Sequence, residues 1–444
     1  MNLHTTEKGF TLIETLVGSA VFVILALSAY RAFGVLMDAV SMSQAKLAAT
    51  TLANEQFEVI RNLPYDDVGI ENGIPVGKIA RNQTVLKDNY SFDVQTTIRN
   101  TDDPFDGTIG GSPSDTSPAD YKLVDLDITC SRCKIFSPLK FTTLVAPHAL
   151  ETASSNGALF IQVFDTAGMP VTNASVHIAN TEANPDIVID EITDNTGWVK
   201  IVDAPPGTNT YNITATKSGF TTDQTYPQGG VAGENPVNED VTVVLQQVTQ
   251  ASLQIDKVSS LNVSSVDALC VALPDISFSL TGEKLIGAPA VKKYPTQDFS
   301  TDSSGGETVS DLEWDTYHIL LTSPAYDFAG GTLLPNFAIN PDENKNLQLL
   351  VVPHVDRALL VSVEDSLGVA IDGASVQLQK DIFDQTKTTN SLTCATPGQA
   401  FWNGLDGGIY TLTVSKAGYT TSVGTVDVSL PWQNQSIILL PETP

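Results

Sequence analysis

The sequence predicts an α+β protein made of a long amino-terminal transmembrane helix, a small antiparallel sheet and three all-β sandwich modules. Three observations lead to this prediction. An apolar run fills residues 10–30 and is followed by apolar residues at helical spacing as far as residue 62. Short stretches of alternating polar and apolar residues lie beyond it, between Gly, Pro and Asp turns. Residues 157–441 then repeat one pattern of strands and turns.

The helix is expected over residues 10–62. Its apolar part, from Phe10 to Tyr30, has about 20 residues and is long enough to cross a hydrocarbon layer of ~30 Å. The outer part carries an apolar stripe on which a sheet can pack, and Pro64 ends the helix after Asn62. The stripe consists of Val35, Met42, Leu47, Leu52, Phe57 and Ile60. Two other interpretations are a secretory signal peptide, whose cleavage site would follow a shorter apolar stretch, and a plain signal anchor.

The residues at the start of this run carry a motif. Lys8 and Gly9 precede the run, Phe10 begins it, and Glu14 is its single carboxylate. This layout resembles the cleavage signal of type IV pilins and of the pseudopilins of type II secretion. The resemblance implies that a prepilin peptidase removes residues 1–9 as a leader, cutting between Gly9 and Phe10, and methylates the new amino terminus.

Glu14 is chemically unusual in this place. A carboxylate within a membrane costs roughly 2.5–3.5 kcal/mol on insertion scales, so it usually marks function. In the resembled family such a Glu pairs with the new α-amine of a neighbouring subunit, and Glu14 is therefore expected to direct assembly into a fibre. The other interpretation is a carboxylate near the cytoplasmic interface whose head reaches water.

A small β domain similar to that of a minor pilin is expected over residues 63–150. Its strands are expected at 90–98, 121–128 and 139–146, where polar and apolar residues alternate. The loop 101–120 between the first two strands is rich in Gly, Pro and Asp.

Four carboxylates in and beside this loop form a candidate metal site: Asp102, Asp103, Asp106 and Asp120. Ca²⁺ prefers several hard oxygen ligands, so a calcium site is one expectation. Their spacing differs from that of an EF-hand loop, which has ligands at alternate positions and a final Glu. Asp-Pro and Asp-Gly are also ordinary turn formers, so a loop without a cation is the alternative. No other cofactor is expected.

The cysteines are too few for a disulfide scaffold. Cys130 and Cys133 form a C-x-x-C, which fits a local disulfide, half of a zinc site or a redox pair. Zinc needs a second pair of ligands, and a redox pair belongs at a helix start, whereas strands are expected on both sides here. A local disulfide or two free thiols is therefore expected. Cys270 and Cys394 each stand alone in a separate module, and the sequence does not choose among the possible pairings.

The repeat defines three modules, at residues 157–248 (module one), 251–353 (module two) and 357–441 (module three). In modules one and three an Asp-x-x-Gly turn precedes Ala-Ser-Val, and a later strand ends in Lys-x-Gly-aromatic-Thr-Thr. Module two matches the repeat less completely, and its Tyr326 stands where Phe220 stands in module one. The modules resemble carboxypeptidase-regulatory-like domains, which are transthyretin-like β-sandwiches. We expect the Asp-x-x-Gly turn to close the first hairpin and the aromatic residue to plug one end of the sandwich.

Composition and motifs exclude two classes of function. The net charge of −28 disfavours binding to a nucleic-acid backbone. The sequence contains no H-E-x-x-H, no G-x-S-x-G and no phosphate-binding loop, and its histidines lack short metal-ligand spacing. The protein is therefore expected not to be an enzyme.

These expectations combine into one hypothesis, a minor pilin-like subunit with a single membrane pass, its amino terminus in the cytoplasm and its bulk outside. Other pilin subunits and prepilin peptidase are the expected partners, and the modules form a stalk for adhesion or surface contact on the cell surface or pilus. Three added modules would crowd a densely repeating major pilin. The alternatives are a type II secretion pseudopilin and a membrane-anchored carbohydrate-binding array, which would expose coplanar rings to a glycan ligand. The candidate rings are Trp198, Trp314, Trp402 and Trp432.

Overall fold

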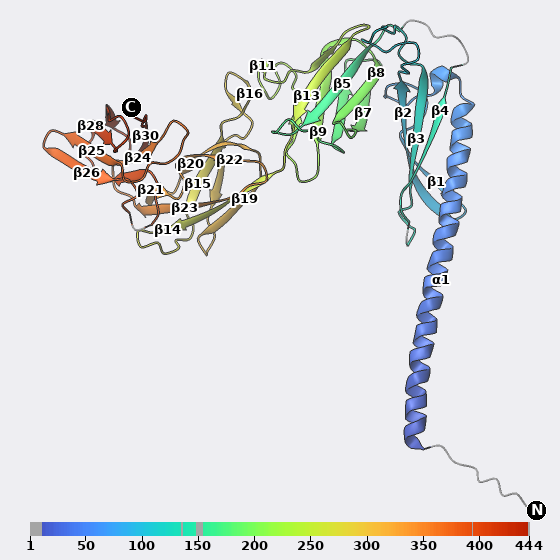
Figure 1. Ribbon diagram of the computed structural model, residues 1–444, viewed down its shortest axis with the longest axis horizontal. Coiled ribbons are helices and arrows are strands. Elements are labelled where there is room, and N and C mark those ends of the chain that lie inside the picture. Colours follow the sequence, from blue (N-terminus) through green and yellow to red (C-terminus); the bar gives the residue numbers. More distant parts are fainter. Residues whose placement is uncertain (1–10, 135, 148–153, 393, 443–444) are drawn as a thin grey trace, which may run out of the picture.

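The computed structural model describes residues 11–134, 136–147, 154–392 and 394–442. Within them, one long helix stands beside a first sheet, and the other sheets follow one another in a row that leads away from the helix (Figure 1). The fold is therefore α+β with most of its regular structure in strands, as the sequence predicts.

The carboxyl-terminal half of the helix packs on the first sheet. Helix α1 runs from Leu12 to Arg61, and its buried residues include Leu52 and Phe57. They share a core with Phe92 and Leu126 of the sheet. The sheet is antiparallel with the order β1-β2-β3-β4. A short 3-10 helix, η1 (Tyr65–Asp67), precedes its strands β1 (Asn82–Lys87), β2 (Tyr90–Thr101), β3 (Tyr121–Thr129) and β4 (Leu139–Val145).

The expected apolar stripe of α1 is correct only in part. Leu52, Phe57 and Ile60 are buried, but Leu47 and Val35 are each 69% exposed. Small residues make the remaining contacts with the sheet: Ala45, Ala48, Ala49 and Ala53. Protein interiors are close-packed, so small side chains let the helix lie close to the sheet, and a search for large apolar residues overlooks that face.

Each module contains two sheets that share a core. In module one β13-β5-β8 packs on β10-β9-β6-β7, with β12 paired to β9. Module two combines β19-β14-β23-β21 with β18-β15-β20-β22, and module three combines β27-β24-β30 with β26-β25-β28-β29.

The strands of module one are β5 (Gly157–Phe164), β6 (Ser175–Asn180), β7 (Ile187–Ile192), β8 (Trp198–Ala204), β9 (Gly207–Thr216), β10 (Asp223–Gln224), β12 (Val241–Val243) and β13 (Val248–Gln254). Those of module two are β14 (Ser259–Val266), β15 (Ser277–Gly282), β18 (Gln297–Ser300), β19 (Gly306–Leu312), β20 (Asp315–Leu321), β21 (Tyr326–Gly331), β22 (Asn336–Ile339) and β23 (Asn344–Pro353). Those of module three are β24 (Ala358–Glu364), β25 (Ser375–Lys380), β26 (Phe383–Thr388), β27 (Gln399–Trp402), β28 (Gly408–Ser415), β29 (Ser422–Val428) and β30 (Trp432–Ile438).

The Asp-x-x-Gly turn closes a short antiparallel bridge, between Phe164 and Pro170 in module one, but the long strands on its two sides do not pair, which corrects part of that expectation. In module one the Gly168 N–H donates to the Asp165 carbonyl at 3.0 Å, and the Val171 N–H donates back to the Val163 carbonyl at 2.9 Å. The chain then crosses to the opposite sheet, where β6 pairs with β7 and β9. The turn therefore connects the two layers of the sandwich.

Strand β13 lies across the expected end of module one at residue 248. It pairs in parallel with β5 along its whole length and so completes the smaller sheet of module one. A linker before Ser259 then leads into module two.

The repeated aromatic residue lies where the chain leaves each module. Phe220 bridges Lys257, Tyr326 pairs with Pro353, and Tyr419 bridges Pro441. The Lys-x-Gly-aromatic segment thus holds the departing chain against the body of its module, a contact that the sequence alone does not reveal.

Direct contacts join neighbouring parts of the row. The Arg81 guanidinium donates to the Val188 carbonyl at 2.8 Å and links the first sheet to module one. Between modules one and two a small separate sheet forms from β11 (Asn235–Pro236), β16 (Leu285–Ala288) and β17 (Val291–Lys292). Modules two and three share part of one core, to which Leu360 and Phe401 of module three contribute.

Candidate functional site

The amino-terminal end of α1 is organised by reciprocal hydrogen bonds. The Glu14 N–H donates to the Thr11 hydroxyl at 3.3 Å, and the Thr11 N–H donates to Glu14 Oε2 at 2.9 Å. The Thr11 hydroxyl donates to the same oxygen at 2.8 Å. This arrangement is a capping box, which satisfies backbone donors at a helix start. The expected processing residues Lys8, Gly9 and Phe10 lie outside the described residues.

Beyond this cap, α1 presents an uncovered apolar surface. The helix contains a strongly apolar stretch of 18 residues, and none of it is buried by the described residues. The hydroxyls of Thr15, Ser19 and Ser28 donate to carbonyls of the preceding turn, so their hydrogen bonds are made within the helix. Within the described part of the chain this is the one helix long and apolar enough to cross a membrane. Because water solvates such a surface poorly, we infer that lipid or other helices cover it.

The first sheet begins to cover the helix at Asp38. The Lys134 ammonium, on the loop between β3 and β4, lies 2.9 Å from the Asp38 carboxylate. The tip of the sheet follows, where the Tyr90 hydroxyl lies 3.5 Å from the Ser41 carbonyl. The uncovered segment from Leu12 to Met37 is roughly 39 Å long at 1.5 Å per residue, which exceeds a hydrocarbon layer of ~30 Å.

The carboxylates of the expected calcium site make contacts within their own loop. Asp102 Oδ2 accepts the Ile109 N–H at 2.9 Å, and Asp103 Oδ1 accepts the Phe105 N–H at 3.1 Å. The Asp120 carboxylate accepts the Asp103 N–H. These are contacts of ordinary Asp turns.

The same loop holds its negative charges close together. Burial raises the pKa of Asp102, and the charges of Asp115, Asp120 and Asp106 raise it further, against the hydrogen bond from the Ile109 N–H. No three His, Cys, Asp or Glu side chains among the described residues are arranged to hold a metal ion. Calcium binding here stays a prediction.

The structure contains two disulfides. Cys130 bonds to Cys133 in the loop beside α1, and Cys270 bonds to Cys394 across 124 residues of sequence. The second bond joins module two to module three, whereas the sequence suggested two solitary cysteines. The signal that could have found it is the worn turn of module two, where Cys270 stands in the place of the repeated glycine.

Histidines and tryptophans are held by local contacts. His177 Nδ1 lies 2.6 Å from Asp190 Oδ1, and His318 Nδ1 lies 2.7 Å from Asn336 Oδ1. Trp402 is buried in the core of module three. Trp432 donates its indole N–H to the Phe328 carbonyl, Trp314 lies under the Lys284 ammonium, and Trp198 is half-buried. These four rings do not form the exposed row that a glycan-binding array needs.

The comparisons with known proteins identify the motif at the amino-terminal end of the chain. Residues 5–30 match the model of the prokaryotic N-terminal methylation motif. The chain therefore carries a type IV pilin signal. This match covers the expected processing residues, the capping box and the first part of the uncovered helix. A search of curated proteins found no significant match.

Several solved structures are weakly similar to the chain. The Bacillus anthracis TIE protein is 14% identical, with 72% of this chain and 59% of that one covered and a TM-score of 0.19. A Streptococcal ancillary pilin is 10% identical, covering 65% of this chain and all of its own, with a TM-score of 0.18. The minor pilin GBS52 of Streptococcus agalactiae is 13% identical over 42% of this chain and 98% of its own, with a TM-score of 0.17. The chain spans less than two thirds of the TIE protein, and TM-scores this low carry no argument.

Proposed function

We propose that the protein is a minor pilin-like subunit that enters a type IV pilus-like fibre through α1 and displays its modules as a stalk for adhesion or surface contact. The observation that carries this proposal is the methylation motif at residues 5–30, which leads into an apolar stretch of helix that is not buried by any of the described residues. Before assembly this helix is a single membrane pass, with the amino terminus in the cytoplasm and the modules outside.

Processing would then switch assembly on. A prepilin peptidase cuts between Gly9 and Phe10, releases the leader and methylates Phe10. The cut creates an α-amine that did not exist before, and a neighbouring subunit's Glu14 attracts it. Both Thr11 donors go to Oε2 of Glu14, and the residue is exposed, so the other carboxylate oxygen is available to an amine. The capping box therefore holds the Glu14 carboxylate in place and leaves one of its oxygens free to bind the amine.

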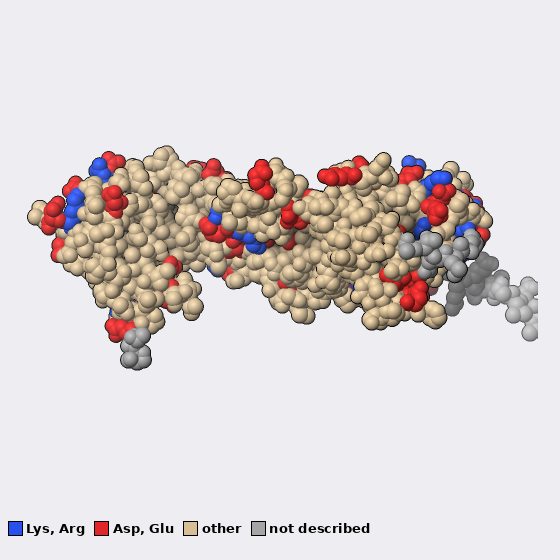
Figure 2. Space-filling view, turned by 90° about the horizontal axis from the view of Figure 1, so that it is seen from above, with Lys and Arg blue, Asp and Glu red and all other residues tan. Residues whose placement is uncertain are grey.

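The β modules suit a projecting stalk. Hydrogen bonds join every neighbouring pair of parts, through side chains at the first and last junctions and through paired backbones between modules one and two, so the row is continuous. Carboxylates are scattered over the face shown in Figure 2, with groups of Lys and Arg beside some of them. In the whole sequence the 51 Asp and Glu outnumber the 23 Lys and Arg, which favours solubility and disfavours a nucleic-acid partner. Three modules on each subunit would crowd a dense filament, so we place the protein among the rare subunits.

The test is the amino-terminal residue of the mature protein, measured by mass spectrometry of the membrane fraction from cells with a prepilin peptidase. The proposal expects N-methylated Phe10 in the wild type and an uncut leader in Gly9→Arg. Gly34→Ala is a matched control, because that glycine lies on the same helix with open space around it and should not affect cleavage. An intact leader in the wild type would overturn the proposal and leave an anchored row of sandwiches.

A further inference from the structure

One turn recurs in all three modules. In modules one and three its aspartates, Asp165 and Asp365, each accept two backbone N–H groups, from the second and the fourth residue beyond. The third residue beyond is Gly168 or Gly368, and both have φ of 76°. That value lies in the left-handed region, where glycine meets no steric cost. The turn therefore favours glycine at this position.

Module two builds the same turn with a different residue. Asp267 Oδ1 accepts the N–H groups of Leu269 at 2.8 Å and Val271 at 3.0 Å, and the residue between them is Cys270 with φ of 62°. A side chain at this φ is disfavoured because Cβ approaches the following carbonyl. Cys270 is therefore an unfavourable residue for this position of the turn. What the cysteine adds is the disulfide to Cys394.

The partner cysteine also lies where the repeat is altered. In module one the Asp194 N–H donates to the Trp198 carbonyl, which closes a tight turn before β8. In module three the matching bond runs from the Asn390 N–H to the Gln399 carbonyl, so a longer loop stands in the same place before β27. Cys394 sits on this loop and is 3% exposed. Both ends of the disulfide are thus departures from a shared pattern.

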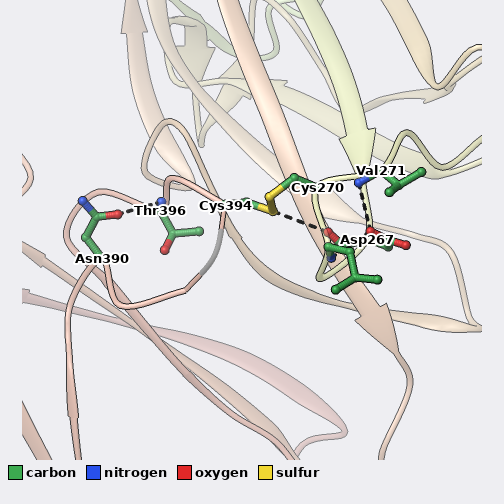
Figure 3. The surroundings of a disulfide bond; sticks show 7 residues. Asp267, Cys270, Val271, Asn390, Cys394 and Thr396 are labelled. Atoms are coloured by element: carbon green, nitrogen blue, oxygen red, sulfur yellow. Dashed lines mark hydrogen bonds between the residues drawn. A yellow bond between two sulfur atoms is a disulfide. The ribbon is translucent and has the colours of Figure 1, made fainter.

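The loop lies against the turn of module two. Figure 3 shows Cys270 and Cys394 joined between the two modules, with Asp267 beside the bond and Asn390 and Thr396 on the loop. The Thr396 N–H donates to Asn390 Oδ1 at 3.1 Å, which holds the loop in shape. The disulfide therefore joins two segments, one from each module, that already lie against each other.

Further contacts join modules two and three. The Trp432 indole N–H donates to the Phe328 carbonyl at 2.8 Å, and Leu360 of β24 belongs to the core of module two. Strand β24 alternates between two partners, because Leu359 and Val361 face the core of module three instead. This explains why the strand is buried along almost its whole length.

We propose that the Cys270–Cys394 disulfide limits how far modules two and three can be extended by tension along the chain. A force applied at the two ends passes through the sulfur–sulfur bond, so the segment between the cysteines carries none of it. Module one contains no cysteine, and its whole length is free to extend. The idea that the modules experience tension rests on the proposed function, whereas the limit that the disulfide sets on extension is a property of the protein alone.

The experiment stretches single molecules of the full chain, held in a lipid nanodisc by α1 and pulled by a tag after residue 444. The wild type is expected to extend less than Cys270→Gly by roughly 410–450 Å, which is 124 residues at 3.3–3.6 Å each. Cys270→Gly is the variant of choice because it restores the glycine of the repeat and leaves the turn free to fold. Equal extensions of wild type and variant would overturn the proposal.

A matched control and a second measurement keep this test sharp. The double variant Cys130→Ser/Cys133→Ser removes a disulfide whose cysteines are three positions apart, and its extension should exceed that of the wild type by only about 10 Å. Adding dithiothreitol to extended wild type should release the hidden length in one step, as the S–S bond is reduced to two thiols and dithiothreitol is oxidised to its cyclic disulfide. If dithiothreitol releases no hidden length, the disulfide does not limit extension and the proposal is wrong. Neither result depends on leader cleavage, so the two proposals fail separately.

Discussion

Gln399 of module three and Gly331 of module two exchange two hydrogen bonds. The Gly331 N–H donates to Gln399 Oε1 at 3.0 Å, and Gln399 Nε2 donates to the Gly331 carbonyl at 2.8 Å. The Gln399 side chain is fully buried. An amide here acts as a strand partner for β21 at the junction of two modules, and a buried polar group of this kind is costly to leave unpaired.

The first prediction concerns this pair. Gln399→Ala leaves the Gly331 N–H and carbonyl buried without partners, and should lower the free energy of unfolding of modules two and three by about 2–3 kcal/mol. The measurement is chemical denaturation of the full protein. Gln385→Ala on the exposed face of β26 is the control and should change little. Equal effects of the two substitutions would show that the amide pair contributes nothing.

A second prediction concerns pH. His354 Nδ1 lies 2.7 Å from the buried Asp327 carboxylate, and that hydrogen bond raises the pKa of His354 above its ordinary value of 6.5, with a further contribution from Asp356. The folded state therefore holds the proton more tightly than the unfolded state. This contribution to stability is complete below pH 6.5 and is lost as pH rises through the folded pKa.

His354→Asn removes the titrating group but keeps an amide donor for Asp327. The thermal midpoint of the wild type should fall more than that of His354→Asn when the pH is raised from 6 to about 8. His318→Asn is a suitable control, since His318 contacts only the neutral amide of Asn336. Parallel pH profiles for the wild type and His354→Asn would contradict the assignment.

A third prediction separates the two faces of α1. Phe57 is 8% exposed in the core beneath the first sheet, and Leu47 is 69% exposed. Phe57→Ala should lower the stability of this domain by about 3 kcal/mol because it opens a cavity, and Leu47→Ala should cost under about 0.5 kcal/mol. Denaturation in detergent micelles, followed by the near-ultraviolet signal of the first sheet, measures both. A large loss from Leu47→Ala alone would mean that the helix docks on the other face.

A fourth prediction concerns the carboxylate loop. Since burial raises the pKa of Asp102 above its ordinary value of 3.8, its ionised form is penalised in the folded state at pH 7. This penalty declines as the pH falls through the folded pKa and is absent only below the ordinary value. Asp102→Asn should therefore raise the thermal midpoint at pH 7, with Asp106→Asn as an exposed control. The calcium site predicted from the sequence is tested in the same samples by adding millimolar Ca²⁺. A calcium-dependent rise in the wild type that Asp102→Asn abolishes would establish that site, and an unchanged midpoint would contradict it.

The sequence was sufficient where a local pattern determines structure. Alternating residues predicted strands at 121–128 and 139–146, and β3 and β4 lie there. The apolar run predicted the uncovered half of α1. These features depend on side-chain periodicity, which is readable from neighbouring residues.

The sequence was insufficient where distant residues meet. The crossing from β5 to the opposite sheet, the pairing of Cys270 with Cys394 and the alanine face of α1 all depend on how separate elements pack. Asp-x-x-Gly predicts a turn but not the sheet that receives the next strand. The capping box is the exception, because the local pattern Thr-x-x-Glu of Thr11 and Glu14 is sufficient to predict it.

The most direct test of the central claim compares Glu14→Gln with Thr11→Ala in sheared fibres. Gln keeps the reciprocal cap because its amide can still accept the Thr11 N–H, but it removes the charge, whereas Thr11→Ala removes the cap and keeps the charge. Mass spectrometry first establishes that both variants begin at Phe10. The account predicts that Glu14→Gln is cleaved but absent from the fibre fraction, and that Thr11→Ala is present. Normal incorporation of Glu14→Gln would contradict assembly through this carboxylate.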